Sequence, residues 1–143
     1  MDTSGFRIDQ LFSFLRISAY WFFEVHPEYK KLFKGFAHVP KAELPQNGKL
    51  LGHALSVMYA LNSIVDNLND PESLVQVLEK IGISHGPRNI TGTHFQNLAV
   101  VLVNFLKEAL GPSLMDSTAE EAWRKSLEVA NSLIVKALEM KET

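Results

Sequence analysis

The stretch KLLGHALSVMYALNSIVDNL, residues 49–68, has the periodicity of one amphipathic helix. Its apolar residues are spaced alternately by four and three positions, which places them on one face of a helix: Leu50, Ala54, Val57, Leu61, Ile64 and Leu68. His53 projects from the edge of that face. Burying an unpaired polar group costs roughly 2–7 kcal/mol, depending on the reference state. We therefore expect a partner or a ligand for this imidazole inside the protein.

The next predicted helix carries a second histidine. Its apolar face includes Leu74, Leu78 and Ile81, and His85 ends that face 32 residues after His53. A short turn joins the two helices, so we expect them to pack as neighbours. A single histidine on an apolar face is more often a hydrogen-bonded core residue than a ligand. Two such histidines also fit a metal or metallocofactor bound between them, and the spacing alone leaves both interpretations open.

The composition is that of one globular domain. The chain has 143 residues, of which 46% are hydrophobic and 21% charged, and its net charge is −2. This balance provides no basic excess for a nucleic-acid backbone or an anionic membrane. The absence of cysteine excludes disulfides, thiolate metal sites and cysteine nucleophiles. We expect a single domain over residues 1–143 with no nucleic-acid partner.

The apolar run LFSFLRISAYWFF, residues 11–23, raises the question of a membrane. It has 13 residues, whereas a helix that spans a bilayer needs about 20. Arg16 interrupts the run, Asp2 and Asp9 precede it, and no small-residue cleavage site follows it. We interpret it as a buried helix and expect a cytoplasmic protein without a membrane partner.

Prolines, glycines and capping residues divide the chain into helices. Pro27 ends the first helix, and Asp70 with Pro71 begins another. Gly-Pro pairs end two helices, and STAE at residues 117–120 is a capping box that opens the last one. The helices are predicted at residues 9–25, 45–68, 71–85, 93–110 and 118–139, with a short helical turn from Pro27 and loops at 37–48 and 88–92. No stretch alternates as a strand does, so the sequence predicts an all-α domain of six to seven helices.

Five segments, in this order, resemble the globin family, and cytoglobins, neuroglobins and invertebrate intracellular globins in particular. They are FFEVHPEYKKLFKGF (22–36), LLGHALSVMYALNSIVDNLND (50–70), VLEKIGISHGPRNIT (77–91), HFQNLAVVLVNFLKEALG (94–111) and EEAWRKSLEVANSLIVKALE (120–139). The resemblance covers about residues 10–140. It implies the globin fold, with helices packed around a haem pocket, and haem b (iron protoporphyrin IX) as the cofactor.

The resemblance also implies roles for individual residues. His85 corresponds to the proximal histidine that ligates the iron, and its second ring nitrogen would hydrogen-bond a carbonyl near Ile81 and the Ser84 hydroxyl. His53 corresponds to the distal histidine. Ala19, or Tyr20 if the register slips by one, would lie above the iron. The remaining residues implied to contact haem are Phe33, Val57, Ile81, Ile90, Phe95 and Leu98.

The implied function is reversible binding of dioxygen and other diatomic gases for storage, supply or sensing. The alternative is a six-coordinate haem protein in which His53 also binds the iron. Such a protein would act as a nitric oxide dioxygenase, a nitrite reductase or a redox sensor, and it would need a reductase. Apart from His53, no acid–base pair in the sequence points to dedicated catalysis, so we favour a ligand-binding protein over an enzyme.

The N-terminus departs from the family pattern. Only MDTSGFRI, residues 1–8, stands where the first globin helix belongs, so we expect that helix to be short or missing. Burial of apolar surface is worth about 25 cal/mol per Å², and an exposed apolar patch usually marks an interface. We therefore expect a homodimer, the commonest closed assembly, with the N-terminal helix and the last two helices at the contact.

Overall fold

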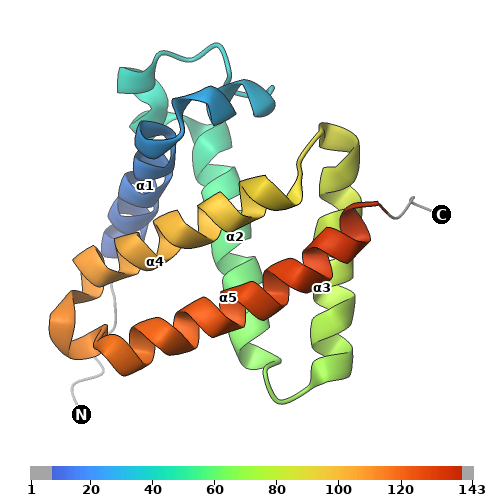
Figure 1. The fold of residues 1–143 in the computed structure, drawn as a ribbon. Helices are drawn as coiled ribbons and strands as arrows, with labels where there is room; N and C mark the ends of the chain where they lie inside the picture. Colours follow the sequence, from blue (N-terminus) through green and yellow to red (C-terminus); the bar gives the residue numbers. More distant parts are fainter. Residues whose placement is uncertain (1–7, 140–143) are drawn as a thin grey trace. The chain divides into compact units, whose positions relative to one another are not determined.

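The computed structural model describes residues 8–139, without the side chains of residues 8–12, 14 and 15. Over this range the chain forms five α-helices and three short 3-10 helices and contains no β-strand (Figure 1). They are α1 (Ile8–Val25), η1 (Pro27–Leu32), η2 (Lys41–Gln46), α2 (Gly48–Asp66), α3 (Pro71–His85), η3 (Gly86–Arg88), α4 (Gly92–Leu114) and α5 (Ser117–Leu138). The all-α prediction is confirmed. The expectation of a shortened first helix concerns residues 1–8, of which 1–7 lie outside the described residues.

The chain divides into two compact units, Met1–Tyr59 and Ala60–Thr143. We call them the N-terminal unit and the C-terminal unit. The first contains α1, η1, η2 and most of α2, and the second contains the end of α2 and all of α3, α4 and α5. Each histidine singled out above therefore belongs to a different unit. A single domain over the whole chain stays a prediction.

An aromatic cluster forms the core of the N-terminal unit. The ring of Phe23 on α1 meets the rings of Phe33 and Phe36 edge-on, with centroid distances of 5.3 and 5.8 Å. Leu44 and Leu50 complete this core and are almost fully buried. The cluster forms because Pro27 ends α1 and begins η1, which folds the next aromatic residues back onto the helix.

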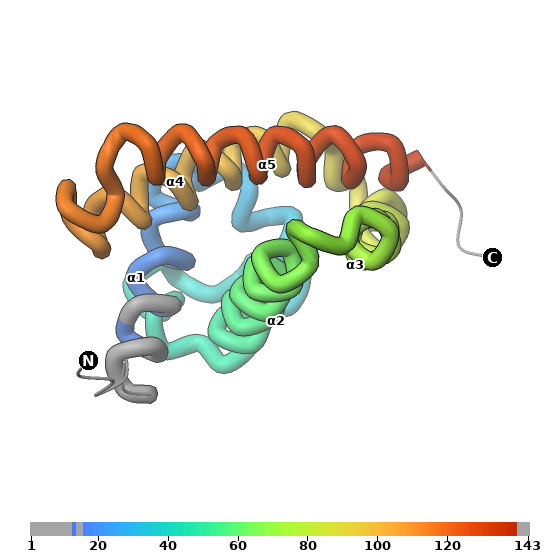
Figure 2. Tube along the Cα trace, turned by 90° about the horizontal axis from the view of Figure 1, so that it is seen from below, coloured from blue at the N-terminus to red at the C-terminus, as the bar shows by residue number. Residues whose placement is uncertain are grey.

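The C-terminal unit is built on α5, which packs against both α3 and α4 (Figure 2). Its core contains Ile64, Leu78, Ala130 and Ile134. Ile64 and Leu78 confirm the apolar faces predicted for α2 and α3. The predicted face of α2 fails at its last member, since Leu68 lies beyond the end of the helix and its side chain is 48% exposed.

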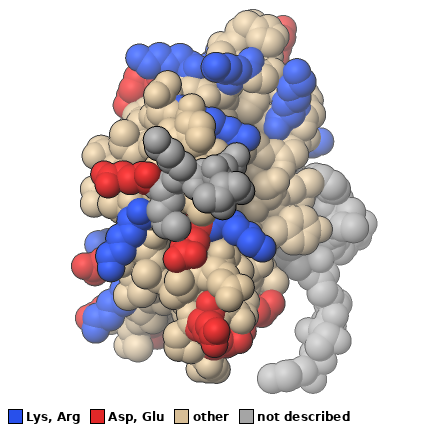
Figure 3. Space-filling model, turned by 90° about the vertical axis from the view of Figure 1, so that its right-hand side faces the viewer, with Lys and Arg blue, Asp and Glu red and all other residues tan. Residues whose placement is uncertain are grey.

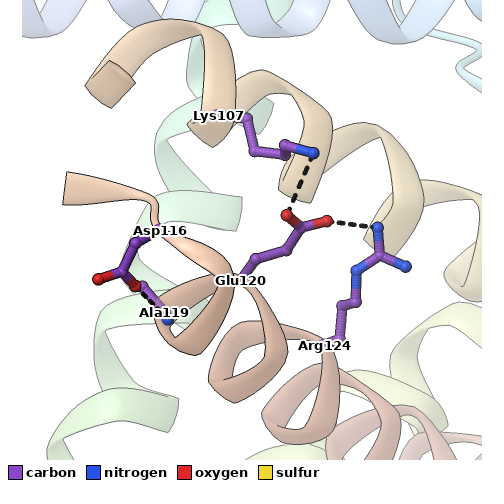
Figure 4. Close-up of polar contacts among 5 residues, drawn as sticks. All are labelled: Lys107, Asp116, Ala119, Glu120 and Arg124. Atoms are coloured by element: carbon purple, nitrogen blue, oxygen red, sulfur yellow. Dashed lines mark hydrogen bonds and ion pairs between the residues drawn. The ribbon is translucent and has the colours of Figure 1, made fainter. Parts of the chain in front are cut away.

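Two predicted helix starts differ from the structure because a neighbouring residue is the cap. Asn47 accepts hydrogen bonds from the backbone N–H groups of Lys49 and Leu50, so α2 begins at Gly48 rather than at residue 45. Asp116, not Ser117, caps α5 by accepting from the Ala119 N–H at 2.8 Å (Figure 4). The cap of α3 is confirmed, because Asp70 accepts from the Ser73 N–H directly before Pro71.

Glu120, expected to close a capping box with Ser117, forms ion pairs instead. Its carboxylate bridges Lys107 of α4 and Arg124 of α5 at 3.1 and 2.6 Å (Figure 4). The hydrogen bond from Lys107, and then the one from Arg124, lower the pKa of Glu120 below its ordinary value. The residue therefore connects α4 to α5 rather than closing the start of its own helix.

Three turns also depart from the expected pattern. The predicted loop at 37–48 contains η2, which the fully buried Leu44 anchors in the core. The α-helix α3 ends at His85 as predicted, but Gly86–Arg88 then form η3, and the chain turns at Asn89, a left-handed residue with φ 61° and ψ 29°. The break expected at Gly111 is a kink inside α4: its φ of 77° is one that glycine tolerates, and helical residues continue to Leu114.

The charged side chains do not form a field of one sign on the face shown in Figure 3, where basic and acidic groups are both present among uncharged ones. This agrees with the net charge of −2. Among the residues that the structure describes, no helix has the length and apolarity to cross a membrane.

Candidate functional site

His85, the last residue of α3, is held by its own helix. Its Nδ1 lies 2.7 Å from the Ile81 carbonyl oxygen and 3.0 Å from the Ser84 Oγ. The Ser84 hydroxyl in turn donates to the same carbonyl at 2.9 Å. The hydrogen bonds expected for this histidine are thus confirmed.

These contacts determine which ring nitrogen of His85 is available to a metal. A carbonyl oxygen only accepts hydrogen bonds, so the proton must be on Nδ1. In the neutral imidazole the lone pair is then on Nε2, which is the form that ligates a metal. The partly buried side chain of His85 therefore has the tautomer that a metal or haem iron requires.

The surroundings of His85 are apolar. The Phe95 ring meets the imidazole edge-on, with centroids 5.4 Å apart. Ile81 and Phe95 pack against the core of the C-terminal unit.

The Phe95 carbonyl accepts a hydrogen bond from Asn131 Nδ2 on α5 at 3.3 Å. The sequence offered no signal for Asn131, because its partner lies 36 residues away along the chain.

His53 is placed by an aromatic neighbour. The ring of Phe33 meets its imidazole at a centroid distance of 5.0 Å and an interplanar angle of 73°. Phe33 itself stacks on Phe36 at 5.1 Å. The half-buried His53 thus borders the aromatic cluster of the N-terminal unit, as expected from its place at the edge of the apolar face of α2.

The remaining predicted residues differ in what the structure shows of them. Val57 in the N-terminal unit, and Ile90 and Leu98 in the C-terminal unit, are half-buried. Ala19 packs against the aromatic cluster. The Tyr20 hydroxyl is hydrogen-bonded to Glu24, and this bond is the main cause of its raised pKa.

The donor set fits a haem better than a metal ion held only by side chains. Among the side chains that the structure describes, no group of three or more His, Asp or Glu residues is arranged to hold a metal ion. His94 accepts from the Thr91 N–H at the start of α4, and His26 stacks on Tyr29 with centroids 4.7 Å apart. His38 is exposed between η1 and η2. His53 and His85 remain, each bordered by phenylalanine. One or two imidazoles with apolar neighbours are what a haem requires.

Comparison with known proteins gives a consistent result. The chain matches the globin family model over residues 19–134. It is 37% identical to the Globin-2 A chain of Anadara inaequivalvis over 101 residues, which are 71% of this chain and 65% of that one. It is 32% identical to Cytoglobin-1 of Danio rerio over 106 residues, 73% of this chain and 61% of that one. The chain thus spans slightly less than two thirds of the length of these two relatives.

The fold has counterparts among solved structures. The hemoglobin from the botfly Gasterophilus intestinalis superposes with a TM-score of 0.82 at 13% identity, covering 92% of this chain and 89% of that one. The Drosophila melanogaster globin superposes with a TM-score of 0.77 at 26% identity, covering 88% and 84%. The predicted helical architecture is confirmed by both.

Proposed function

We propose that this chain, which belongs to the globin family, binds haem b through His85 and takes up dioxygen reversibly. Haem binding follows from the family, whereas the ligand, the haem type and the gas are our proposal. The observation that carries it is the hydrogen bond between His85 Nδ1 and the Ile81 carbonyl, which leaves the Nε2 lone pair for a metal. Haem iron, when bound, supplies the site at which a diatomic gas is held.

The residues of the chain would then have separate roles in haem and gas binding. The Ile81 carbonyl and the Ser84 hydroxyl orient the proximal imidazole and raise its basicity. The apolar side chains would cover the faces of the porphyrin and exclude water, which slows oxidation of the iron. His53, the proposed distal residue, would donate a hydrogen bond toward the gas, whose bound form carries partial negative charge. Besides the two histidines, the proposed contact residues are Phe33, Val57, Ile81, Ile90, Phe95 and Leu98.

Replacement of His85 by alanine tests the central proposal. We expect the variant to lose stable haem uptake, measured by visible absorption after reconstitution, and to regain it when imidazole is added. His38→Ala is the control, because this exposed histidine lies between η1 and η2 and should leave the spectrum unchanged. Full haem retention in His85→Ala with an unaltered spectrum would reject His85 as the ligand.

We further propose that His53 binds the iron directly when no gas is present. The half-buried imidazole beside Phe33 supports this role, as does the likeness to Cytoglobin-1. The gas-free ferrous protein should then have a six-coordinate spectrum, and His53→Leu should convert it to the five-coordinate type. A five-coordinate spectrum in the unmodified protein would leave His53 as a hydrogen-bond donor only.

Two further features belong to the proposal. A homodimer is favoured by exposed apolar side chains on α1, where Ile17 and Val25 are 56% and 55% accessible. Sedimentation at micromolar concentration would contradict the dimer by showing a single species with the 16.1 kDa mass of the chain plus haem.

The second feature is the choice between reversible gas binding and enzyme activity that depends on a reductase. Measured rates of autoxidation and of reduction of the haem iron distinguish the two. Cytoplasmic location stays a prediction.

A further inference from the structure

Three glycines near His85 in the sequence, Gly82, Gly86 and Gly92, all abut the C-terminal part of α5. A Cβ atom added to Gly82 would lie 2.5 Å from Ala137 Cβ and 2.7 Å from the Ile134 carbonyl oxygen. One added to Gly86 would overlap the Leu138 carbonyl oxygen.

These contacts require glycine for close approach and not for an unusual conformation, since Gly86 is right-handed helical. A flexible side chain can rotate away from a collision, but a backbone carbonyl cannot. The last turn of α3 therefore lies on α5 in a position that a side chain at Gly82 or Gly86 would not allow. Figure 1 shows the C-terminal part of α5 crossing α3.

The start of α4 is held by the same helix. A Cβ on Gly92 would lie 2.8 Å from Val135 Cγ2. One turn earlier on α5, Asn131 donates to the carbonyl of Phe95. His85 and Phe95, whose rings meet at 5.4 Å, are thus both placed against one segment of α5 although they belong to different helices.

We propose that residues 131–138 of α5 position the proximal imidazole, with Gly82 and Gly86 as positioning residues that seat α3 and Asn131 as the one that seats α4. This segment sets where the His85 ring stands relative to Phe95, and so the direction in which Nε2 is presented. The inference rests on the proposed function for its consequence in haem binding. The placement of the ring itself is a property of the protein without haem.

Gly82→Ala is the direct test. Alanine is the better helix former, so the variant keeps α3 helical and displaces it from α5. Because the Ile81 carbonyl moves with His85 on the same helix, Nδ1 should stay protonated. The position relative to Phe95 should change, and the NMR signals of the His85 ring protons in the haem-free protein should shift through the altered ring current. In the haem-loaded protein we expect haem dissociation to accelerate about 10-fold or more, as for other groups that support a metal ligand.

Gly52→Ala is the matched control for the His85 signals. Gly52 lies inside α2, and a Cβ there would meet no atom within 4 Å. The ring signals of His85 should be unchanged in this variant. A folded Gly82→Ala protein with the His85 signals and haem dissociation rate of the unmodified chain would overturn the proposal.

If Gly82→Ala does not fold, Gly92→Ala and the double variant Gly92→Ala/Val135→Ala test the same positioning of the His85 ring by α5. Gly92→Ala should shift the signals of Phe95 and His85, because its Cβ would collide with Val135 Cγ2. Val135→Ala removes both Cγ atoms, so the double variant should return the signals to their original positions. A double variant no closer to the original than Gly92→Ala alone would overturn the proposal.

Failure of the proposed function gives a different result. If the unmodified chain takes up no haem, the ring signals of the haem-free protein still test the positioning by α5. If the unmodified chain binds haem through His85 while Gly82→Ala changes neither readout, only the positioning inference fails.

Discussion

The N-terminal and C-terminal units place their histidines beside different neighbours. In the C-terminal unit, hydrogen bonds within one helical turn orient His85, and the backbone of a second helix lies against the glycines beside it. In the N-terminal unit, His53 borders an aromatic cluster through the edge of Phe33.

The difference matches the two roles proposed. A metal ligand needs one tautomer and one direction, and hydrogen bonds to fixed backbone atoms supply both. The role proposed for His53 is to donate to a gas or to bind the iron, and its edge-on contact with Phe33 places it beside the aromatic cluster.

The largest expected effect comes from a pair of leucines, one in each unit. Leu44 and Leu78 are both 0% exposed, so Leu44→Ala and Leu78→Ala should each cost about 2–5 kcal/mol of unfolding free energy. Only Leu78→Ala should also shift the NMR signals of His85, because Leu78 lies on the same helix, α3, in the core of the C-terminal unit. Denaturant titration and NMR measure the two effects. Equal shifts of His85 in both variants would show that the packing at Leu78 has no specific effect on this imidazole.

The next effect concerns the hydroxyl that assists the proximal hydrogen bond. Ser84→Ala removes an oxygen 3.0 Å from His85 Nδ1 and leaves the Ile81 carbonyl in place. Haem dissociation should accelerate by up to about 10-fold. Ser56→Ala is the control, since this serine also donates to a carbonyl of its own helix, that of Gly52, but in the N-terminal unit. Equal acceleration in the two variants would show that the hydroxyl has no specific role.

Removal of one helix cap in each unit should have a smaller effect on stability. Asn47 caps α2 in the N-terminal unit and Asp116 caps α5 in the C-terminal unit. Replacement of either by alanine should lower the unfolding free energy by about 1 kcal/mol. Ser117→Ala should have little effect, because Asp116 already provides the cap. A larger loss for Ser117→Ala than for Asp116→Ala in thermal unfolding would restore the original capping-box prediction.

The smallest effect expected is a dependence of stability on acid. Glu24 pairs with Lys41 in the N-terminal unit, and Glu120 pairs with Lys107 and Arg124 in the C-terminal unit. These partners lower the pKa of both glutamates, Glu24 mainly through Lys41 and Glu120 mainly through Lys107. Each glutamate thus stabilises the fold fully above its ordinary pKa of 4.5, and this contribution is lost as the pH falls through the lowered value.

Thermal unfolding between about pH 6 and pH 3 measures this dependence. Glu24→Gln and Glu120→Gln should lower the midpoint at the higher pH and converge with the unmodified protein at the lower one. A difference that stays constant across the range would show that the charges of the two glutamates do not contribute.

The sequence was sufficient to predict where the α-helices lie and which hydrogen bonds His85 makes. The apolar periodicity around Leu50 and Leu78 and the cap at Asp70 depend on residues within a few positions of each other. The His85–Ile81 bond likewise spans one helical turn. The sequence-based start of α5 was wrong because Asp116 and Ser117 are adjacent candidates for its cap, and that of α2 was placed too early because Asn47 is the cap.

The arrangement around His85 depended on tertiary structure. Gly86 follows the last residue of α3, as its sequence signal predicts, but no local signal shows that it also admits the Leu138 backbone. Asn131 looks like one polar residue among several on α5, yet it bonds to the carbonyl of Phe95. The sequence by itself determined what recurs within a helical turn, because those contacts follow from the geometry of the helix. How closely α5 approaches α3 and α4 depended on the packing of whole helices. A local sequence pattern does not predict the distance between segments that come together only on folding.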